Sequence, residues 1–302
     1  CRQYDTISYY GVVLNVDRLV GDVRQELAVK RLSLRLDDAN VLTASAVLPF
    51  SAFLVLRLVI TLFLFACIIW SGFDDRVDDA KWFIYLTNLS FAMLNIAFIM
   101  LSALSLSKAY RMHQNKPQTE AYGTFETSVE AARRQEQIEL PSEGQQIRMN
   151  IQSPALCKWY HQVIWLIYNV AFCAAIIVSI GYWLFQAKHV QFLDVVTHAF
   201  NTIFVLIEHL LGRVPIRLFH AVYTIIYLSL YVIFSVIYWQ AGGLNARGKT
   251  YIYKIFDYDN KNAGVITAFV LLLAVIGPIV IQLILLGLCK LRGHWFSCKS
   301  EA

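Results

Sequence analysis

The sequence predicts an all-α membrane protein, a polytopic bundle of about six transmembrane helices with both termini in the cytoplasm. Hydrophobic residues make up 58% of the chain and charged residues 16%, with a mean hydropathy of +0.52. A typical soluble domain is about 45–50% apolar and about 25% charged. The apolar residues are gathered into long runs, each sufficient to cross a hydrocarbon core of roughly 30 Å as a helix.

Residues 1–46 precede the first apolar run and are polar to amphipathic. The segment Val23–Leu36, VRQELAVKRLSLRL, places leucines on one side of a helix and basic residues elsewhere. Such a helix suits an anionic membrane surface. An ordinary solvated tail explains the same residues equally well, and both alternatives stay open.

The six spans are expected at Val47–Trp70, Trp82–Leu106, Tyr160–Leu184, Asp194–Leu211, Leu218–Gln240 and Val265–Leu288. This divides the chain into the first two spans (47–106), a long polar loop (107–158), four further spans (159–289) and a basic tail (290–302). The loop has few apolar residues, so we expect much of it to be disordered. Arg57, inside the first span, is expected to extend towards the nearer interface. Gly277-Pro278 predicts a kink in the sixth span.

The distribution of lysine and arginine gives the orientation. The amino-terminal region, the long loop, the GRVPIR segment and the tail are basic and fall on one side, whereas the loop DDRVDDAK is acidic. Because basic loops stay in the cytoplasm, both termini are predicted there. The loop 242–264 also carries basic residues and is the exception to this pattern.

The fourth predicted span is unusually polar. Asp194, His198, Asn201 and Glu208 fall within one narrow face of a helix that turns about 100° per residue. Ionisable groups in hydrocarbon are costly unless they face the bundle interior or a wet cavity. We therefore expect this face to point inward and the other helices to be arranged around it.

Several classes of function find no support in the residues. The net charge of +5 comes from basic residues beside apolar runs, which indicates membrane orientation and not nucleic-acid binding. The six cysteines form no CxxC pair, so we expect neither a disulfide framework nor a zinc site. A transporter or metal site with His198, Glu208, His209 and His220 as ligands is disfavoured. Glu208 and His209 are neighbours on a helix and point about 100° apart, so they make a poor pair on one site. No cofactor is expected.

Two stretches resemble a known family. THAFNTIFVLIEHLLGRVPIRLFH and YVIFSVIYWQAGGLNARGKTYIYKIFDYDN, together with YLTN at Tyr85–Asn88, are similar to the rolling stone family of multi-pass membrane proteins. Leu89 and Tyr258 depart from it by standing where many members have tryptophan. The family in turn looks distantly similar to the androgen-induced-gene family of integral-membrane hydrolases, which cleave fatty acid esters of hydroxy fatty acids with a threonine nucleophile and a histidine.

Carried over by position, this distant similarity implies that Thr87 is the nucleophile and His198 its partner. A threonine hydroxyl is a weak nucleophile until a base accepts its proton, and histidine has the pKa for that work. Asn88, Asp194, Asn201 and Glu208 would form a supporting polar network, in which an asparagine could donate to a developing oxyanion. The substrate would carry an acyl chain. The same polar residues are equally compatible with a buried network that only fixes helix register.

The alternative is a non-enzymatic membrane protein in cell–cell interaction or myoblast fusion, the process with which the rolling stone family is linked. The loop 242–264, rich in glycine, asparagine and aromatic residues, would then be the surface that meets a cell-surface partner. Under either hypothesis the chain contacts membrane lipids and resides in the plasma membrane or the endoplasmic reticulum.

Overall fold

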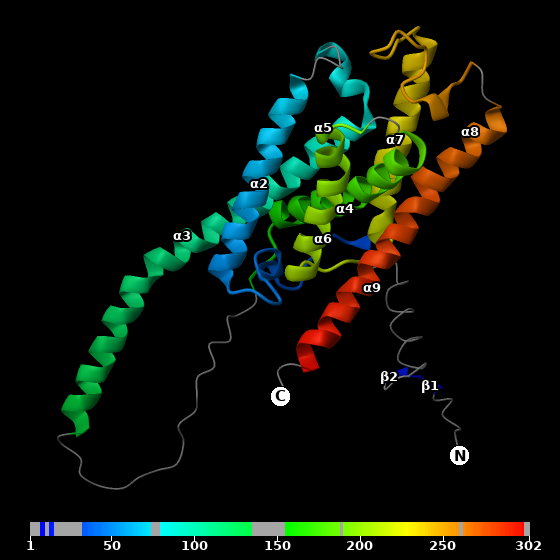
Figure 1. Ribbon diagram of the computed structural model, residues 1–302. Helices are drawn as coiled ribbons and strands as arrows, with labels where there is room; N and C mark the ends of the chain where they lie inside the picture. The colour runs from blue at the N-terminus through cyan, green and yellow to red at the C-terminus, as the bar shows by residue number, and fades with distance from the viewer. Residues whose placement is uncertain are drawn as a thin grey trace.

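The protein is a bundle of apolar helices. The first helix begins, and the last helix ends, at the same end of this bundle. The computed structural model describes residues 7–9, 12–14, 32–73, 79–134, 155–187, 190–259 and 262–298. Within these, six helical segments are long and apolar enough to cross a membrane, as predicted. The start of the first and the end of the last lie at the same end of the bundle (Figure 1). We call this the terminal end, and the opposite one, which carries residues 241–259, the loop end.

The spans agree closely with their predicted positions. The first three are α2 (Phe50–Gly72), the start of α3 (Leu86–Arg134), and α4 (Trp159–Phe185). The fourth comprises α5 (Phe192–Asp194), η4 (Val195–Phe200) and α6 (Asn201–Leu211), and the fifth η5 (Leu218–His220) and α7 (Ala221–Gln240). The sixth comprises α8 (Ala263–Val270), η7 (Leu271–Ile276) and α9 (Gly277–Cys298).

The remaining elements are short. Three 3₁₀ turns are η2 (Ala39–Leu42), η3 (Asp79–Ile84) and η6 (Lys254–Phe256). The strands β1 (Ile7–Tyr9) and β2 (Val12–Leu14) pair antiparallel, with Ile7 opposite Leu14. They lie outside the bundle (Figure 1). The protein is therefore all-α in its membrane region, and these elements only connect or flank the spans.

The centre of the bundle is α4, not the fourth span that the sequence suggested. In its most apolar window 72% of α4 is buried, against 44% for the fourth span and 28% for α2. Small residues at Ala171, Ala174 and Ala175 are almost fully buried and let neighbouring helices approach closely. The helices α3, α6, α7 and α9 all pack against α4. The polar fourth span is thus one neighbour of an apolar central helix.

Two predictions about the connecting segments need correction. α3 does not end at Leu106 but continues to Arg134, so residues 107–134 of the expected disordered loop are helical. Extending an existing helix avoids the cost of nucleating a new one, and this stretch is rich in good helix formers. Residues 135–154 lie outside the described residues.

The proposed amphipathic helix Val23–Leu36 falls mostly outside the described residues. Its last part, from residue 33, is not helical: Leu36 is buried in the core, and Arg217 donates hydrogen bonds to the carbonyls of Ser33 and Arg35. These contacts tie the segment to the start of the fifth span. Residues 33–36 therefore pack against the bundle and do not lie separately on a membrane surface.

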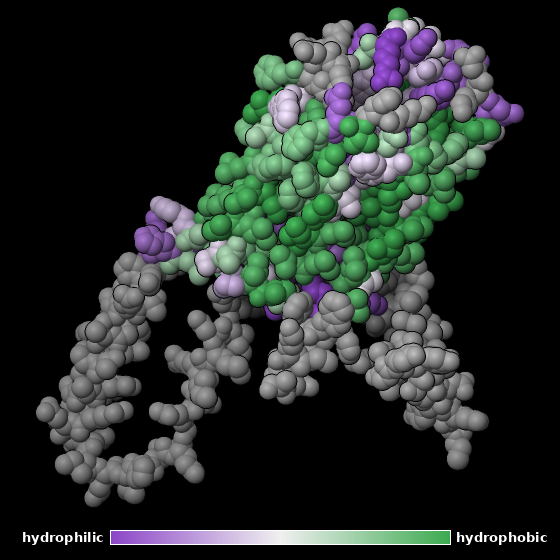
Figure 2. All heavy atoms as spheres, viewed as in Figure 1, coloured by the Kyte–Doolittle hydropathy of each residue, from purple (hydrophilic) through white to green (hydrophobic). Residues whose placement is uncertain are grey.

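An apolar belt surrounds the bundle. Figure 2 shows a continuous hydrophobic zone across the face in view, with hydrophilic residues gathered at the loop end. Exposed large apolar side chains recur on the outer faces of α2, α7 and α9; they include Val55, Val59, Leu62, Leu230, Ile233, Ile237, Leu283 and Ile284. In water such a surface would be an aggregation hazard, whereas in lipid it is the expected boundary.

Two spans depart from α geometry through a π turn. η7 comes immediately before Gly277-Pro278, where a kink was predicted. Proline lacks the amide hydrogen that a helix needs at this position, so the hydrogen bonding of the preceding turn must rearrange. The other π turn, η4, contains His198.

At the terminal end the chain before α2 is fastened to the end of α6. The amide of Ala46 donates to the Leu211 carbonyl at 2.7 Å, and that of Arg213 donates to the Ala44 carbonyl at 3.0 Å. Ser45 and Gly212 face each other in this bridge. A side chain on Gly212 would have no room, because its Cβ would lie 2.7 Å from the Glu208 carbonyl oxygen.

We therefore expect Gly212→Ala to lower the stability by about 1–3 kcal/mol, as overpacking usually does. The measurement is thermal or denaturant unfolding of the purified protein in detergent. Gly287→Ala is the matched control, since a Cβ there meets nothing within 4 Å. Equal stability of the two variants would contradict this account of the bridge.

Candidate functional site

The polar face of the fourth span divides between the two ends of the bundle. His198, Asn201 and Glu208 are each no more than 3% exposed, so the inward orientation holds for them. Asp194 differs: it is only partly buried, and its carboxylate accepts a hydrogen bond from the Gln191 amide, at 2.9 Å, where the helix begins. Asp194 is therefore a helix cap. A carboxylate at that position also interacts favourably with the helix dipole.

Glu208 forms a buried ion pair with Arg57 of α2. The guanidinium Nε donates to Glu208 Oε2 at 3.0 Å, and Nη2 donates to Oε1. Arg57 is fully buried, so the expectation that it extends to the interface was wrong. The physical reason is that a bidentate carboxylate partner lies opposite it inside the bundle.

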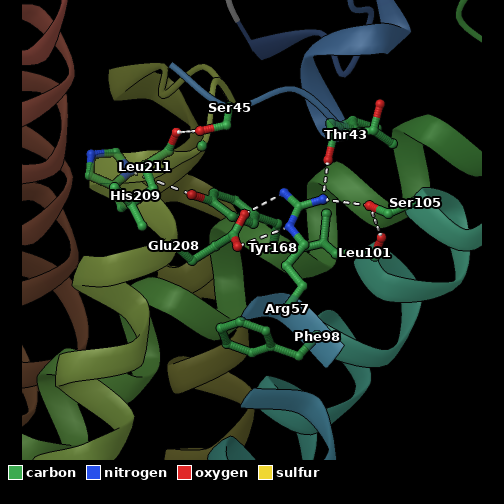
Figure 3. Close-up of polar contacts among 12 residues, drawn as sticks. Thr43, Ser45, Arg57, Phe98, Leu101, Ser105, Tyr168, Glu208, His209 and Leu211 are labelled. Carbon is green, nitrogen blue, oxygen red and sulfur yellow. Dashed lines mark hydrogen bonds and ion pairs between the residues drawn. The ribbon is translucent and has the colours of Figure 1, made fainter. Parts of the chain in front are cut away.

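The Arg57 guanidinium is also satisfied on its other side. Its Nη1 donates to the Leu42 carbonyl at 2.8 Å and to Ser105 Oγ of α3 at 2.9 Å. Its carbon lies 4.2 Å from the centre of the Phe53 ring. Figure 3 shows the guanidinium between Glu208 and Ser105, so this one side chain joins α2, α3 and α6.

A second set of polar contacts begins at His209, the residue after Glu208, and connects α6 to α4 and α9. His209 Nε2 bonds to the Leu285 carbonyl at 2.8 Å, which leaves Nδ1 to face the Tyr168 hydroxyl at 3.5 Å. Arg292 of α9 donates to the carbonyls of His209 and Gly212. These polar groups at the terminal end satisfy one another. Their contacts hold α4, α6 and α9 together.

A pocket lies at the loop end. It has a volume of about 70 Å³ and is lined by residues from α3, α4, α7, η7 and the α7–α8 loop, among them Thr87, Gly181, Tyr182, Tyr231, Tyr253 and Ala274. Most of its wall is apolar. The space holds a few atoms of a ligand, and a longer chain would have to continue into the surrounding lipid.

Thr87 stands at the rim of this pocket, at the start of α3. Its backbone amide donates to the Tyr253 hydroxyl at 3.2 Å, and its Oγ1 lies 3.4 Å from the same hydroxyl. Burial raises the pKa of Tyr253, so this phenol is neutral and can donate a proton in a hydrogen bond. Asn88 points elsewhere, donating to the Trp82 carbonyl at 2.8 Å.

His198 lies beside the pocket, behind Tyr182. The two rings are stacked with their centres 3.8 Å apart and their planes 5° from parallel. His198 Nδ1 is buried without a hydrogen-bond partner. Asn201, one turn further on, donates to the Thr197 carbonyl.

The structure shows no hydrogen bond between Thr87 and His198. Tyr182 is the side chain that contacts both regions: it borders the same pocket as Thr87, and its ring stacks on the His198 ring. Glu208 belongs to the Arg57 pair at the other end and Asp194 to a cap, so the expected supporting network does not form as one unit. Tyr182 and Tyr253 gave no signal in the sequence, where tyrosines near span ends are common anchors.

Metal binding has no support in this arrangement. Among the residues that the structure describes, no group of three or more His, Cys, Asp or Glu side chains could hold a metal ion. Glu208 and His209 point to different partners, Arg57 and Leu285.

Comparison with known proteins supports the resemblance in the second half of the chain. Residues 153–300 match the family model described as protein rolling stone. Protein rolling stone of Drosophila melanogaster is 30% identical over 137 residues, which are 43% of this chain and 49% of the relative. The chain thus spans about half the length of the curated relative it matches. No solved structure matches. His198 and Tyr253 lie inside the matched region, whereas Thr87 precedes it.

The ion pair leads to a stability prediction. Arg57→Met or Glu208→Leu alone should cost about 3–5 kcal/mol, because each leaves an uncompensated buried charge. The double variant Arg57→Met/Glu208→Leu should recover much of that loss, since no charge remains unpaired.

Unfolding of the purified variants in detergent measures both effects. Lys249→Gln, an exposed charge in the α7–α8 loop, is the control and should change stability by less than about 0.5 kcal/mol. If the losses of the two single variants simply add in the double variant, the pair is not the source of the effect.

Proposed function

The chain belongs to the rolling stone family, and from this premise we propose that it is an intramembrane hydrolase of lipid esters with Thr87 as nucleophile and His198 as base. The observation that carries the proposal is the shared wall of the loop-end pocket. Thr87 lines that pocket, and so does Tyr182, whose ring covers the imidazole of His198. Tyr182 thus contacts His198 and borders the same pocket as Thr87.

In the proposed reaction the Thr87 hydroxyl oxygen attacks the ester carbonyl and His198 accepts the hydroxyl proton. The alkoxide leaving group then takes that proton, and an acyl-threonine remains until water hydrolyses it. The neutral Tyr253 hydroxyl lies beside Thr87 Oγ1 and is placed to donate to the developing oxyanion.

The chemistry requires the Tyr182 ring to leave its position over His198. The ring is only partly buried and borders the pocket, so an entering acyl chain would occupy the space beside it. Catalytic hydrogen bonds are commonly completed only when substrate is bound. The unpartnered Nδ1 of His198 is consistent with a group that awaits a partner.

A fluorophosphonate probe on the purified protein tests the nucleophile. We expect Thr87→Val, which keeps the side-chain shape, to abolish labelling and Thr87→Ser to retain it. His198→Ala should slow labelling by about 10²–10⁴-fold, the contribution of a general base. Thr267→Ala, at an exposed hydroxyl in α8, should react like the wild type. Equal labelling of wild type and Thr87→Val would remove the hydrolase proposal.

A second candidate function is cell–cell interaction through the α7–α8 loop, and the ordering of this loop favours it. Asn245 Oδ1 accepts the amides of Arg247 and Lys249, at 2.8 and 3.0 Å, and Nδ2 donates to the Tyr251 carbonyl. The amide of Ala246 donates to the Tyr85 hydroxyl of the second span. A loop held in this way presents fixed side chains at the loop end, which lowers the entropic cost of binding.

A cysteine at Lys249→Cys tests whether this loop faces the cell exterior. A membrane-impermeant maleimide should label it on intact cells, whereas Cys157 and Cys289, towards the other end of the bundle, should react only after permeabilisation. If Lys249→Cys also needs permeabilisation, both the interaction role and the predicted orientation are wrong.

A further inference from the structure

We propose that the groove between α3 and α4 at the terminal end is a binding site for an anionic phospholipid. The site is distinct from the loop-end pocket and does not depend on the hydrolase proposal. The groove has a volume of about 320 Å³ and is lined by Met100, Ala103, Leu104, Ser107, Arg111, Tyr160 and Ile164.

The lining changes character along the groove. Its deeper part, from Met100 to Leu104 on α3 and Ile164 on α4, is apolar and lies within the two spans. Its outer part holds Ser107, Arg111 and Tyr160, towards the end of the second span and at the start of the third. An acyl chain matches the first part and a polar headgroup the second. The groove therefore has the same polarity gradient as a lipid of one leaflet.

Basic side chains surround the outer part. Arg111 and Lys158 both act electrostatically on His161 in α4, and Arg111 also acts on Lys108 one turn away. The side chains of Arg111 and Lys158 are exposed, and Lys108 is partly buried. Their guanidinium and ammonium groups are the usual partners of lipid phosphates.

The neighbouring acidic group offsets only part of this charge. Asp38 acts on Lys108, but its carboxylate already accepts the amides of Asn40 and Ala155, each at 2.9 Å. Lys108 donates to Thr43 Oγ1 at 3.3 Å. Arg111 lines the groove, and Lys158 immediately precedes α4, whose Tyr160 forms part of the groove wall. The outer part of the groove thus has a positive charge, which favours an anionic over a zwitterionic lipid.

Native mass spectrometry of the full chain released from nanodiscs provides the test. With mixed phosphatidylserine and phosphatidylcholine discs, we expect retention of phosphatidylserine over phosphatidylcholine. Arg111→Gln and Lys158→Gln should each reduce that preference about fivefold, the effect of one basic residue near an anionic surface. Lys249→Gln, at the loop end, is the charge-matched control and should leave the preference unchanged.

A groove-filling variant distinguishes the binding of the lipid acyl chain from the effect of the basic side chains. Ala103→Leu adds bulk to an exposed groove position without altering charge, so it should lower retention of the lipid while thermal stability stays near that of the wild type. Adding soluble glycerophosphoserine asks whether the phosphate headgroup alone suffices; we expect no competition at millimolar concentration. Competition would show a soluble phosphate site and overturn the lipid proposal. So would equal retention of both lipids, or equal loss in the Lys249→Gln control.

Discussion

The Arg57–Glu208 ion pair is the interaction on which the arrangement of the helices depends. Both groups are almost completely buried between apolar spans, where either charge would be costly without the other. The pair joins α2 to α6, and Ser105 adds α3 through the same guanidinium. Since α2 is otherwise exposed to lipid over most of its surface, this charged contact specifies its register. Dispersion forces between apolar helices in lipid are much less selective.

The two ends of the bundle differ in the hydrogen bonding of their buried polar groups. At the terminal end Glu208 bonds to Arg57, His209 to the Leu285 carbonyl, and Arg292 to backbone carbonyls. At the loop end a buried histidine nitrogen has no partner, and a π turn and a pocket lie beside it. π turns inside helices are frequent at functional sites. The buried ion pair and the unpartnered histidine nitrogen therefore lie in separate parts of the fold.

The structure changes how the polar fourth span is interpreted. Four residues that share one helix face were expected to act together, yet Asp194 caps the helix, Glu208 pairs with Arg57, and His198 stacks on Tyr182. A helix of this length crosses the whole membrane, so residues on one face lie at different depths and meet different neighbours. A shared face indicates inward orientation, but it does not indicate a shared site. The α7–α8 loop supplies Tyr253 to the pocket, and its role also depended on tertiary contacts.

The sequence alone determined the fold class, the number and approximate positions of the spans, and the burial of His198, Asn201 and Glu208. Those properties follow from hydropathy and helical periodicity, which act locally along the chain. Only the tertiary structure decided that α4 is the central helix and that Arg57 is paired inside the bundle. It also decided that Tyr182 stacks on His198 and borders the same pocket as Thr87. The physical reason is that pairing between helices depends on rotation and depth, and hydropathy contains neither.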